Sequence, residues 1–229
     1  MVKRHLKRMD SPKSWPITRK ETVFVVRPRP SGHKMGQSLP VSILLKDVLG
    51  YASTTRAVRF LLTTQEVLVN GRRVRRPEDT AGLMDVVTFP STKTSFRILI
   101  DQRNKLSAVP IAGEETKLIP SKVTSKRLQP GGRLQLGFHN GRTLITDEKG
   151  YKVGDTLLLT LENRSHAHFP LAKGSFAIIT GGKHVGTAGV VEKVEGSKVF
   201  LAAEGIVIET AKGHAFVLGH EKPAIKLRS

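Results

Sequence analysis

Arginines beside a tight turn are the residues of this chain best suited to a specific chemistry. The run 66–77 contains Asn70-Gly71, the dipeptide that favours a two-residue type I′ hairpin turn. A guanidinium group forms forked, bidentate hydrogen bonds with phosphate, and each basic position after the turn is Arg rather than Lys. We therefore predict a phosphate-binding hairpin. Its four arginines are Arg72, Arg73, Arg75 and Arg76.

Groups that could support catalysis are present but are not arranged as an active site. The chain has no Cys, which excludes disulfides, Cys-based zinc sites and thiol nucleophiles. His166 and His168 could share one face of a strand, but no acid cluster stands beside them, which favours surface histidines over a metal site. The paired acids 114–115 and 147–148 stand in polar turns, and no glycine run is followed by the Lys-Ser/Thr of a P-loop. We expect no enzyme activity, metal, cofactor or small-molecule substrate.

Two short amphipathic helices are expected before the hairpin. Residues 41–49 carry apolar side chains at the spacing i, i+3, i+4 and i+7, which is typical of one helix face. A second helix starts at a Ser53 or Thr54 cap and turns its apolar residues inward. This leaves Arg56 and Arg59 on its other face, pointing the same way as each other.

The rest of the chain reads as short strands separated by turn signals. We expect an α+β multidomain protein: a basic extended arm (1–36), an RNA-binding module of two helices and a small sheet (37–92), a central all-β domain (93–169) and a small C-terminal β-barrel (170–229). The expected strands of the central domain are 96–100, 134–138, 143–146 and 156–161; those of the barrel are 176–180, 189–194, 198–201, 205–209 and 214–218.

The charge balance indicates a polyanionic partner. Thirty-eight lysines and arginines against nineteen acids give a net charge of +19, which attracts nucleic acid. Aromatic residues make up only 5% of the chain, too few to stack successive unpaired bases, so structured RNA or duplex fits better than a single strand. No apolar run reaches the ~18 residues of a spanning helix, and no signal peptide is evident. We therefore expect a soluble intracellular protein with no membrane partner.

The first 36 residues are the most basic segment. They hold ten lysines and arginines, two acids and four prolines, a composition that cannot supply a core. We expect an arm that becomes ordered on RNA, with Trp15 exposed in the free protein; a disordered solubility tail is the alternative. The residues expected to contact RNA in the arm are Lys3, Arg4, His5, Lys7, Arg8, Lys13, Trp15, Arg19, Lys20, Arg27, Arg29 and Lys34.

Two motifs resemble known RNA-binding families. Thr55-Arg56 together with Val69-Asn70-Gly71 and the arginines resembles the domain shared by the bacterial ribosomal protein S4, pseudouridine synthases and some tRNA synthetases. The glycine-rich segment 173–191 looks like a KOW motif, in which glycines let backbone N–H groups approach phosphate. We therefore add Asn70, Lys183 and His184 to the arginines of the module as expected RNA contacts.

In this order, the segments make the whole chain similar to the archaeal and eukaryotic small-subunit ribosomal protein S4e family. The resemblance implies a non-catalytic protein that binds small-subunit rRNA and neighbouring ribosomal proteins, on cytoplasmic ribosomes. Thr187-Ala188 departs from the basic residue often found in a KOW loop, so phosphate contact there is less expected than in the arm. The alternative is a non-ribosomal RNA-binding factor of RNA modification or transcription elongation. Asp85 could then suggest a pseudouridine synthase, but the remaining residues leave no room for its separate catalytic domain.

Overall fold

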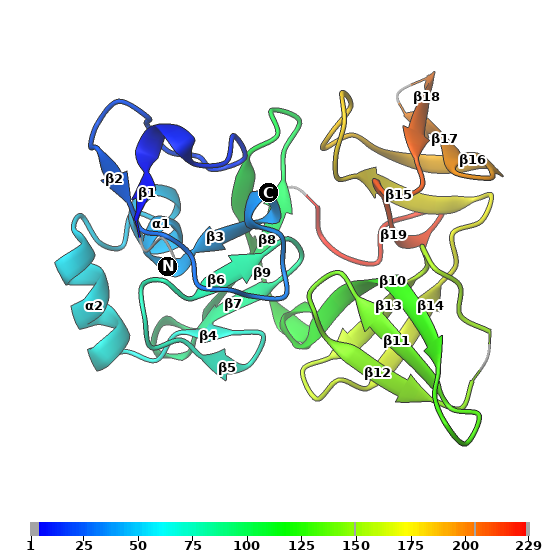
Figure 1. The fold of residues 1–229 in the computed structure, drawn as a ribbon, viewed down its shortest axis with the longest axis horizontal. Coiled ribbons are helices and arrows are strands. Elements are labelled where there is room, and N and C mark those ends of the chain that lie inside the picture. The colour runs from blue at the N-terminus through cyan, green and yellow to red at the C-terminus, as the bar shows by residue number, and fades with distance from the viewer. Residues whose placement is uncertain (1–4, 149, 204, 228–229) are drawn as a thin grey trace. The chain divides into compact units, whose positions relative to one another are not determined.

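The computed structural model describes residues 5–148, 150–203 and 205–227. The chain divides into two compact units (Figure 1). The first consists of the residues up to Leu99 together with Lys105–Thr116, and the second of Ile100–Asn104 and the residues from Lys117 onward. Antiparallel sheets form the framework of both units, and the α-helices of the described residues belong to the first. The expectation of a mixed α+β fold is therefore confirmed.

The first unit contains one five-stranded sheet in the order β5-β4-β7-β8-β9 and two small sheets, β1-β2 and β3-β6. Its elements are β1 (Leu6–Lys7), β2 (Phe24–Val25), β3 (Ser38–Pro40), α1 (Val41–Ile43), α2 (Thr55–Thr64), β4 (Leu68–Val69), β5 (Arg72–Arg73), β6 (Thr80–Gly82), β7 (Val86–Phe89), β8 (Thr94–Ile100) and β9 (Leu106–Ile111). Single 3-10 turns occur at Arg8–Asp10, Met35–Gln37, Pro90–Thr92 and Gly113–Lys117.

The first helix lies where the periodicity predicts it, with one local difference. α1 is short and continues directly into a π-helical turn, Leu44–Val48. Ser38 lies in β3, and Pro40 occupies the position before the helix without a side-chain cap. Gly50 follows the helical segment with a φ of 69°, a left-handed conformation that suits glycine at a helix end.

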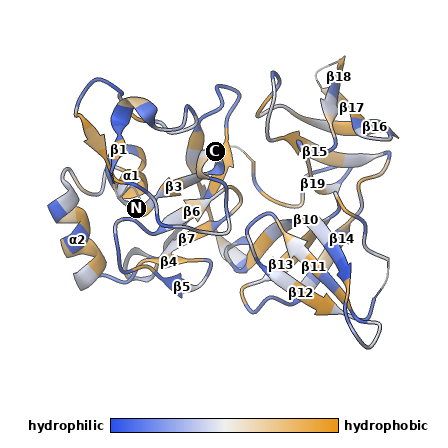
Figure 2. Ribbon diagram, viewed as in Figure 1, coloured by the Kyte–Doolittle hydropathy of each residue, from blue (hydrophilic) through white to orange (hydrophobic). Residues whose placement is uncertain are grey.

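The second helix matches its prediction closely. Thr54 caps α2, since its Oγ1 accepts a hydrogen bond from the backbone N–H of Ala57 at 3.1 Å. Val58 and Leu62 of this helix are buried. Hydrophilic and hydrophobic residues both lie along α2 in Figure 2. Arg56 and Arg59 are exposed as expected, and Phe60 beside them is also exposed.

Residues 94–111, expected to begin the central domain, pair instead with the sheet of the first unit. The run expected at 96–100 forms β8, which pairs antiparallel with β7 through Val87 and Phe96 and extends the sheet of the first unit. β9, in a segment with no predicted strand, forms the edge of the same sheet. A short β-type run does not reveal its partner, because strand pairing depends on distant residues. The sheet that contains β7 therefore continues to Ile111, and the next sheet begins with the strand Leu118–Leu128.

The second unit contains two five-stranded sheets, ordered β12-β11-β10-β13-β14 and β18-β17-β16-β15-β19. Most of its expected strands are present; β10 and β14 are additional. Figure 1 shows the first sheet in green to yellow and the second in yellow to red. Their strands are β10 (Leu118–Leu128), β11 (Leu134–Phe138), β12 (Thr143–Thr146), β13 (Thr156–Thr160), β14 (Ser165–Phe169), β15 (Ser175–Ile179), β16 (Ala188–Glu195), β17 (Lys198–Ala203), β18 (Ile206–Ala211) and β19 (Ala215–His220).

A buried lysine joins the two sheets of the second unit. The Nζ of Lys122 on β10 donates hydrogen bonds to the carbonyl oxygens of Lys212, Gly213 and Ala215 at 3.1, 2.8 and 2.6 Å. These carbonyls lie at the turn into β19 and its first residue. Burial, followed by repulsion from Lys212, lowers the pKa of Lys122 to about 8. These three hydrogen bonds offset part of the free-energy cost of desolvating the ammonium group.

The low pKa of Lys122 predicts a stability change with pH. Between pH 8 and 10.5 the folded protein releases this proton while the unfolded chain keeps it, so stability should rise with pH across that window. The rise should be on the order of 1–3 kcal/mol. Urea unfolding of the full chain at both ends of the window, compared with Lys122→Met, isolates this contribution. An NMR titration of the Lys122 Cε signal with a midpoint at the ordinary lysine value would contradict it.

Candidate nucleic-acid interface

Most of the basic residues expected to contact RNA are exposed. Lys3 and Arg4 lie outside the described residues. Lys183 and His184 belong to the second unit, and the remaining expected contacts belong to the first. The exposed positions are His5, Lys7, Lys13, Lys20, Arg27, Arg29, Lys34, Arg56, Arg59, Arg72, Arg73, Arg75, Arg76, Lys183 and His184.

Trp15 does not lie where the sequence placed it. The indole ring is fully buried, with 0% of the residue exposed, and its Nε1 donates a hydrogen bond to the carbonyl of Ser38 at 2.8 Å. Lys105 Nζ donates to the carbonyl of Trp15 at 3.2 Å, and Leu106 N donates to that of Ser14 at 2.9 Å. The expected extended arm is therefore packed on the first unit. Burial is favourable here because the indole ring is large and apolar and its one polar atom, Nε1, has a hydrogen-bond acceptor.

Arg8 is also buried and does not face a partner. Only 4% of its side chain is exposed, and its Nη2 lies 2.8 Å from Glu21 and 3.6 Å from Asp47. Its Nη1 donates to Thr22 at 3.1 Å, and its Nε donates to the carbonyl of Thr18. Burial outweighs the nearby cations, so the pKa of Asp47 lies above its ordinary value. The guanidinium group of Arg8 thus holds residues 8–22 together through these contacts and is not available to bind phosphate.

Arg19 is half-buried, and its guanidinium group also forms hydrogen bonds within the arm. Its Nη1 donates to the carbonyl of Met9 at 2.9 Å, and its Nη2 donates to that of Pro12 at 3.1 Å. Both bonds close the loop that leads from β1 toward Trp15. The sequence could not distinguish this arginine from its exposed neighbours, because the acceptors are backbone carbonyls that any residue supplies.

The arginine hairpin has the geometry that its turn residues predict. Asn70 and Gly71 have φ values of 50° and 77°, as the two central positions of a type I′ turn require. The register pairs Leu68 with Arg73 and Val69 with Arg72. Successive side chains of a strand point to opposite faces, so Arg72 and Arg73 project to different sides of the hairpin.

Asn70 orders the hairpin through a buried aspartate. Its Nδ2 donates to Asp85 Oδ1 at 2.7 Å, and its Oδ1 accepts from Val86 N at 2.9 Å. Asp85 Oδ2 accepts from Gly82 N at 2.7 Å and lies 3.0 Å from the Nε2 of His33. A Cβ on Gly82 would stand 2.2 Å from the His33 ring, so only glycine fits there. Asn70 therefore acts as a structural residue in this arrangement.

The same aspartate connects the arm to the hairpin. Asp85 is only 3% exposed and receives hydrogen bonds from residues 70 and 82 in addition to the His33 contact. Burial acts to raise the pKa of Asp85, but the His33 ring and the hydrogen bonds from Gly82 and Asn70 outweigh it, so the pKa lies below its ordinary value. This carboxylate holds three separate segments together and is enclosed, which does not suit a catalytic aspartate.

The glycine-rich segment of the second unit forms an exposed loop on a tightly packed base. Lys183 and His184 stand at its tip, between Gly182 and Gly186, which have φ values of 89° and 79°. A Cβ on Gly186 would lie 2.3 Å from the backbone of Asp101, so the close approach of these two segments requires glycine. The tip of the loop is thus exposed to solvent, whereas its base packs closely against the backbone of Asp101.

Sequence reasoning missed several exposed side chains near the basic residues. Phe24 of β2 is 56% exposed, and Met35 is 37% exposed. The signal for Phe24 was an aromatic residue placed between Lys20 and Arg27 in a segment that otherwise has few apolar clusters. In the second unit, the tip of the β10–β11 hairpin carries Arg127, Arg133 and the 72% exposed Leu128.

The described residues hold neither a cluster of metal ligands nor a helix suited to crossing a membrane. No group of three or more His, Asp or Glu side chains within this part of the chain could hold a metal ion. His168 lies 2.9 Å from Asp155, and His166 is exposed in β14. No helix of the described ranges is long and apolar enough to cross a membrane.

Comparison with known proteins identifies the family. A model described as the RS4NT (NUC023) domain matches residues 2–36, and one described as ribosomal family S4e matches residues 92–166. The small ribosomal subunit protein eS4 of Methanocaldococcus jannaschii is 36% identical, with 98% of each chain covered. This chain belongs to the eS4 family. The eS4 proteins of Methanothermobacter thermautotrophicus and Methanospirillum hungatei are 34% and 36% identical, over 98% and 96% of this chain and 96% of each relative.

A solved structure of the eS4 family shares the fold. The crystal structure of the 30S ribosomal protein S4e from Thermoplasma acidophilum has a TM-score of 0.70 and 31% sequence identity. The match covers 80% of this chain and 96% of that one. The resemblance to the S4e family that the order of motifs indicated is therefore confirmed for nearly the whole chain.

Proposed function

We propose that this protein is a structural, non-catalytic component of the small ribosomal subunit and binds small-subunit rRNA through phosphate contacts. Full-length similarity to eS4 proteins is the observation that supports this role. The net charge of +19 supplies the attraction to a polyanion. A non-ribosomal RNA-binding factor is less well supported, because the relatives matched over nearly their full length are ribosomal proteins. We infer that the protein resides on cytoplasmic ribosomes.

The exposed arginines of α2 and the β4–β5 hairpin are the proposed centre of the RNA surface. Arg56 and Arg59 extend from the helix, and the hairpin arginines Arg72, Arg73, Arg75 and Arg76 lie on or just after the turn. Their backbone positions are fixed by the Thr54 cap and by the Asp85 network, and guanidinium groups held on a rigid framework form bidentate phosphate contacts with little loss of entropy.

The exposed basic residues of the arm extend this proposed surface, and the glycine-rich loop is a second proposed contact. The exposed arm residues follow a path folded by Arg8 and Trp15, so they are presented from a fixed backbone. Lys183 and His184 stand at the tip of their loop, where backbone N–H groups are also accessible to phosphate. We infer that the chain also contacts neighbouring proteins of the small subunit, since its full-length relatives are small-subunit ribosomal proteins.

Replacing Arg56, Arg59, Arg72 and Arg73 with Ala should weaken rRNA binding while leaving stability nearly unchanged. All four side chains are exposed, and surface substitutions usually change the free energy of unfolding by less than about 0.5 kcal/mol each. Binding can be measured by fluorescence anisotropy of labelled rRNA, and unfolding by the fluorescence of buried Trp15. Intact binding together with a large loss of stability would mean that these residues belong to the core.

Sedimentation tests the ribosomal role. A structural component should remain with the small subunit after a high-salt wash of cell lysate, whereas a transient factor should be released. A tagged chain that appears only in the wash, and never with the small subunit, would contradict the proposal.

A further inference from the structure

Two adjoining hollows lie beside the packed arm of the first unit. The larger has a volume of about 700 Å³, and three arginines contribute to its lining: Arg27, Arg29 and Arg76. The smaller has a volume of about 380 Å³ and is lined in part by His5 and Phe24. Arg27 and Met35 line both hollows, so the two lie next to each other, and together they make up the arm groove.

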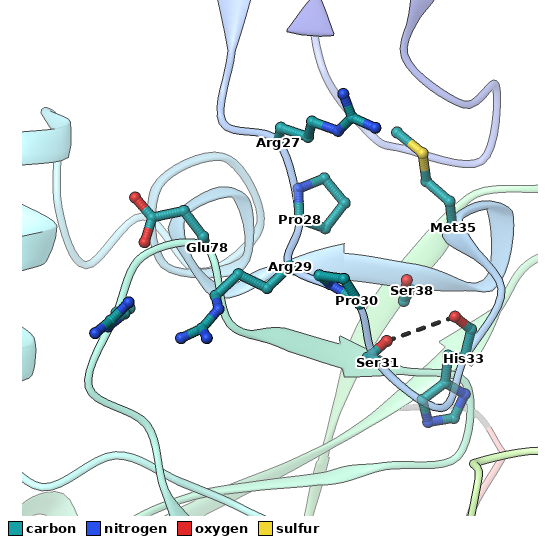
Figure 3. A pocket seen from close by; sticks show the side chains of 10 residues that line it. Arg27, Pro28, Arg29, Pro30, Ser31, His33, Met35, Ser38 and Glu78 are labelled. Atoms are coloured by element: carbon teal, nitrogen blue, oxygen red, sulfur yellow. Dashed lines mark hydrogen bonds between the residues drawn. The ribbon is translucent and has the colours of Figure 1, made fainter. Parts of the chain in front are cut away.

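The larger hollow combines cations with apolar walls. Pro28, Pro30 and Met35 supply apolar surface, and Glu78 is the single acid against three arginines. Figure 3 shows Arg27 and Arg29 extending to opposite sides of the chain at Pro28, with Arg27 on the side of Met35. An anion with an apolar or aromatic body therefore matches this lining better than a peptide or a simple salt ion.

The arginine-bearing segments are fixed relative to each other. Arg29 N donates to the carbonyl of Glu78 at 2.9 Å, and Arg29 Nη1 lies 3.7 Å from Asp79 Oδ1. The other oxygen of Asp79 accepts from the backbone N–H groups of Arg75 and Arg76 at 3.3 and 3.1 Å. The Arg29 side chain is half-exposed, so its long ion pair is weak and leaves the guanidinium group able to meet a phosphate.

The smaller hollow presents an aromatic face. Phe24 is 56% exposed, and its ring centroid lies 5.8 Å from that of His5. β2 holds Phe24 in place by pairing it with Lys7 of β1, and Arg8 N donates to the carbonyl of Val23 at 2.9 Å. A large aromatic ring left in water at the end of an arginine groove is a surface on which a nucleobase stacks.

We propose that this groove holds one unpaired nucleotide of RNA, with its base stacked on Phe24 and its phosphates bound by Arg27, Arg29 and Arg76. The inference rests on the proposed rRNA-binding function and adds the class of ligand that this part of the surface recognises. Phe24 supplies one phenyl ring to the lining of the groove, which suits one extruded base and not a run of them, in agreement with the low aromatic content of the chain. Arg76 also belongs to the hairpin surface, so a paired stem bound there can place an extruded nucleotide in the groove.

The proposal is tested with two short RNA hairpins and the full chain. One hairpin carries a single extrahelical 2-aminopurine in its stem, and the other has the same stem fully paired. The wild-type chain should bind the bulged hairpin more tightly and quench the 2-aminopurine emission by stacking. Phe24→Leu should reduce affinity for the bulged hairpin by roughly 5- to 100-fold, the range expected for loss of one base–aromatic stack. Phe24→Tyr, which keeps the ring, should retain the preference.

Methionine methyl groups give a second, local readout. In the chain labelled at its methionine methyls, the Met35 signal should shift with the bulged hairpin and much less with the paired one. Exposed Met9 and buried Met84 serve as controls, because neither lines the groove. Trp15 fluorescence verifies that each variant is folded.

Several outcomes would overturn the inference. Equal affinity of the wild-type chain for both hairpins would show that the groove does not recognise an unpaired nucleotide, while leaving the proposed rRNA binding intact. A Phe24→Leu variant that keeps the preference would exclude stacking on this ring. Free AMP that shifts the Met35 signal at the same concentrations as the bulged hairpin would assign the groove to a free nucleotide instead. Failure to bind either hairpin would count against the proposed function as well.

Discussion

We expect the affinity for small-subunit rRNA to fall by about three to five orders of magnitude between about 50 and 200 mM salt, if roughly six to ten phosphates are neutralised. The physical reason is that each phosphate contact releases condensed counterions, whose entropy of release decreases as bulk salt increases. The net charge of +19 and the many exposed arginines and lysines of the first unit supply enough cations for this number of contacts. Anisotropy titrations of a labelled rRNA fragment over a salt series measure the slope.

The arginine variants provide the matched control for this salt dependence. The quadruple variant at Arg56, Arg59, Arg72 and Arg73 should show a shallower slope, by about one for each phosphate contact removed. A variant at Arg164, an exposed arginine of the second unit that lies 3.3 Å from Glu162, should leave the slope nearly unchanged. A nearly flat salt response of the wild-type protein would contradict binding dominated by phosphate contacts.

Asp85→Ala should lower the free energy of unfolding of the first unit by about 3–5 kcal/mol, the cost of removing one partner from a buried charged network. The substitution leaves the Asn70 amide, the Gly82 N–H and the His33 ring without this carboxylate in a buried site. Because small domains are stable by only about 5–15 kcal/mol, much of the protein should then populate unfolded forms of this unit at moderate temperature. Denaturation followed by Trp15 fluorescence reports the change, since that ring is buried in the same unit.

The pH dependence of the Asp85 network has a defined sign. The pKa of Asp85 is lower in the folded protein than in the unfolded chain, so its stabilisation is present above the unfolded value and is lost as pH falls through the folded value. Asp147→Ala is the matched control, because 84% of that side chain is exposed and its stability effect should stay within about 0.5 kcal/mol. Equal stability of the Asp85 and Asp147 variants would show that the network does not support the fold.

The sequence by itself determined the features that depend on neighbouring residues. The apolar spacing of residues 41–49 and the cap at Thr54 predicted both helical segments, because helix periodicity and capping are local. Asn70-Gly71 predicted the hairpin, since only a few dipeptides adopt positive φ at both positions. The five strands after residue 174 also followed from alternating runs and turns. The order of these motifs was sufficient to indicate the eS4 family.

Only the tertiary structure decided which residues of the arm face water. Arg8 and Trp15 look like RNA contacts in sequence, but acceptors at Glu21 and Ser38 draw them into the interior. The same packing exposes Phe24 and brings Arg29 beside the loop of Arg76, from segments more than forty residues apart. Burial and proximity of this kind come from contacts between distant parts of the chain, and composition or periodicity does not encode which distant partner a segment will find.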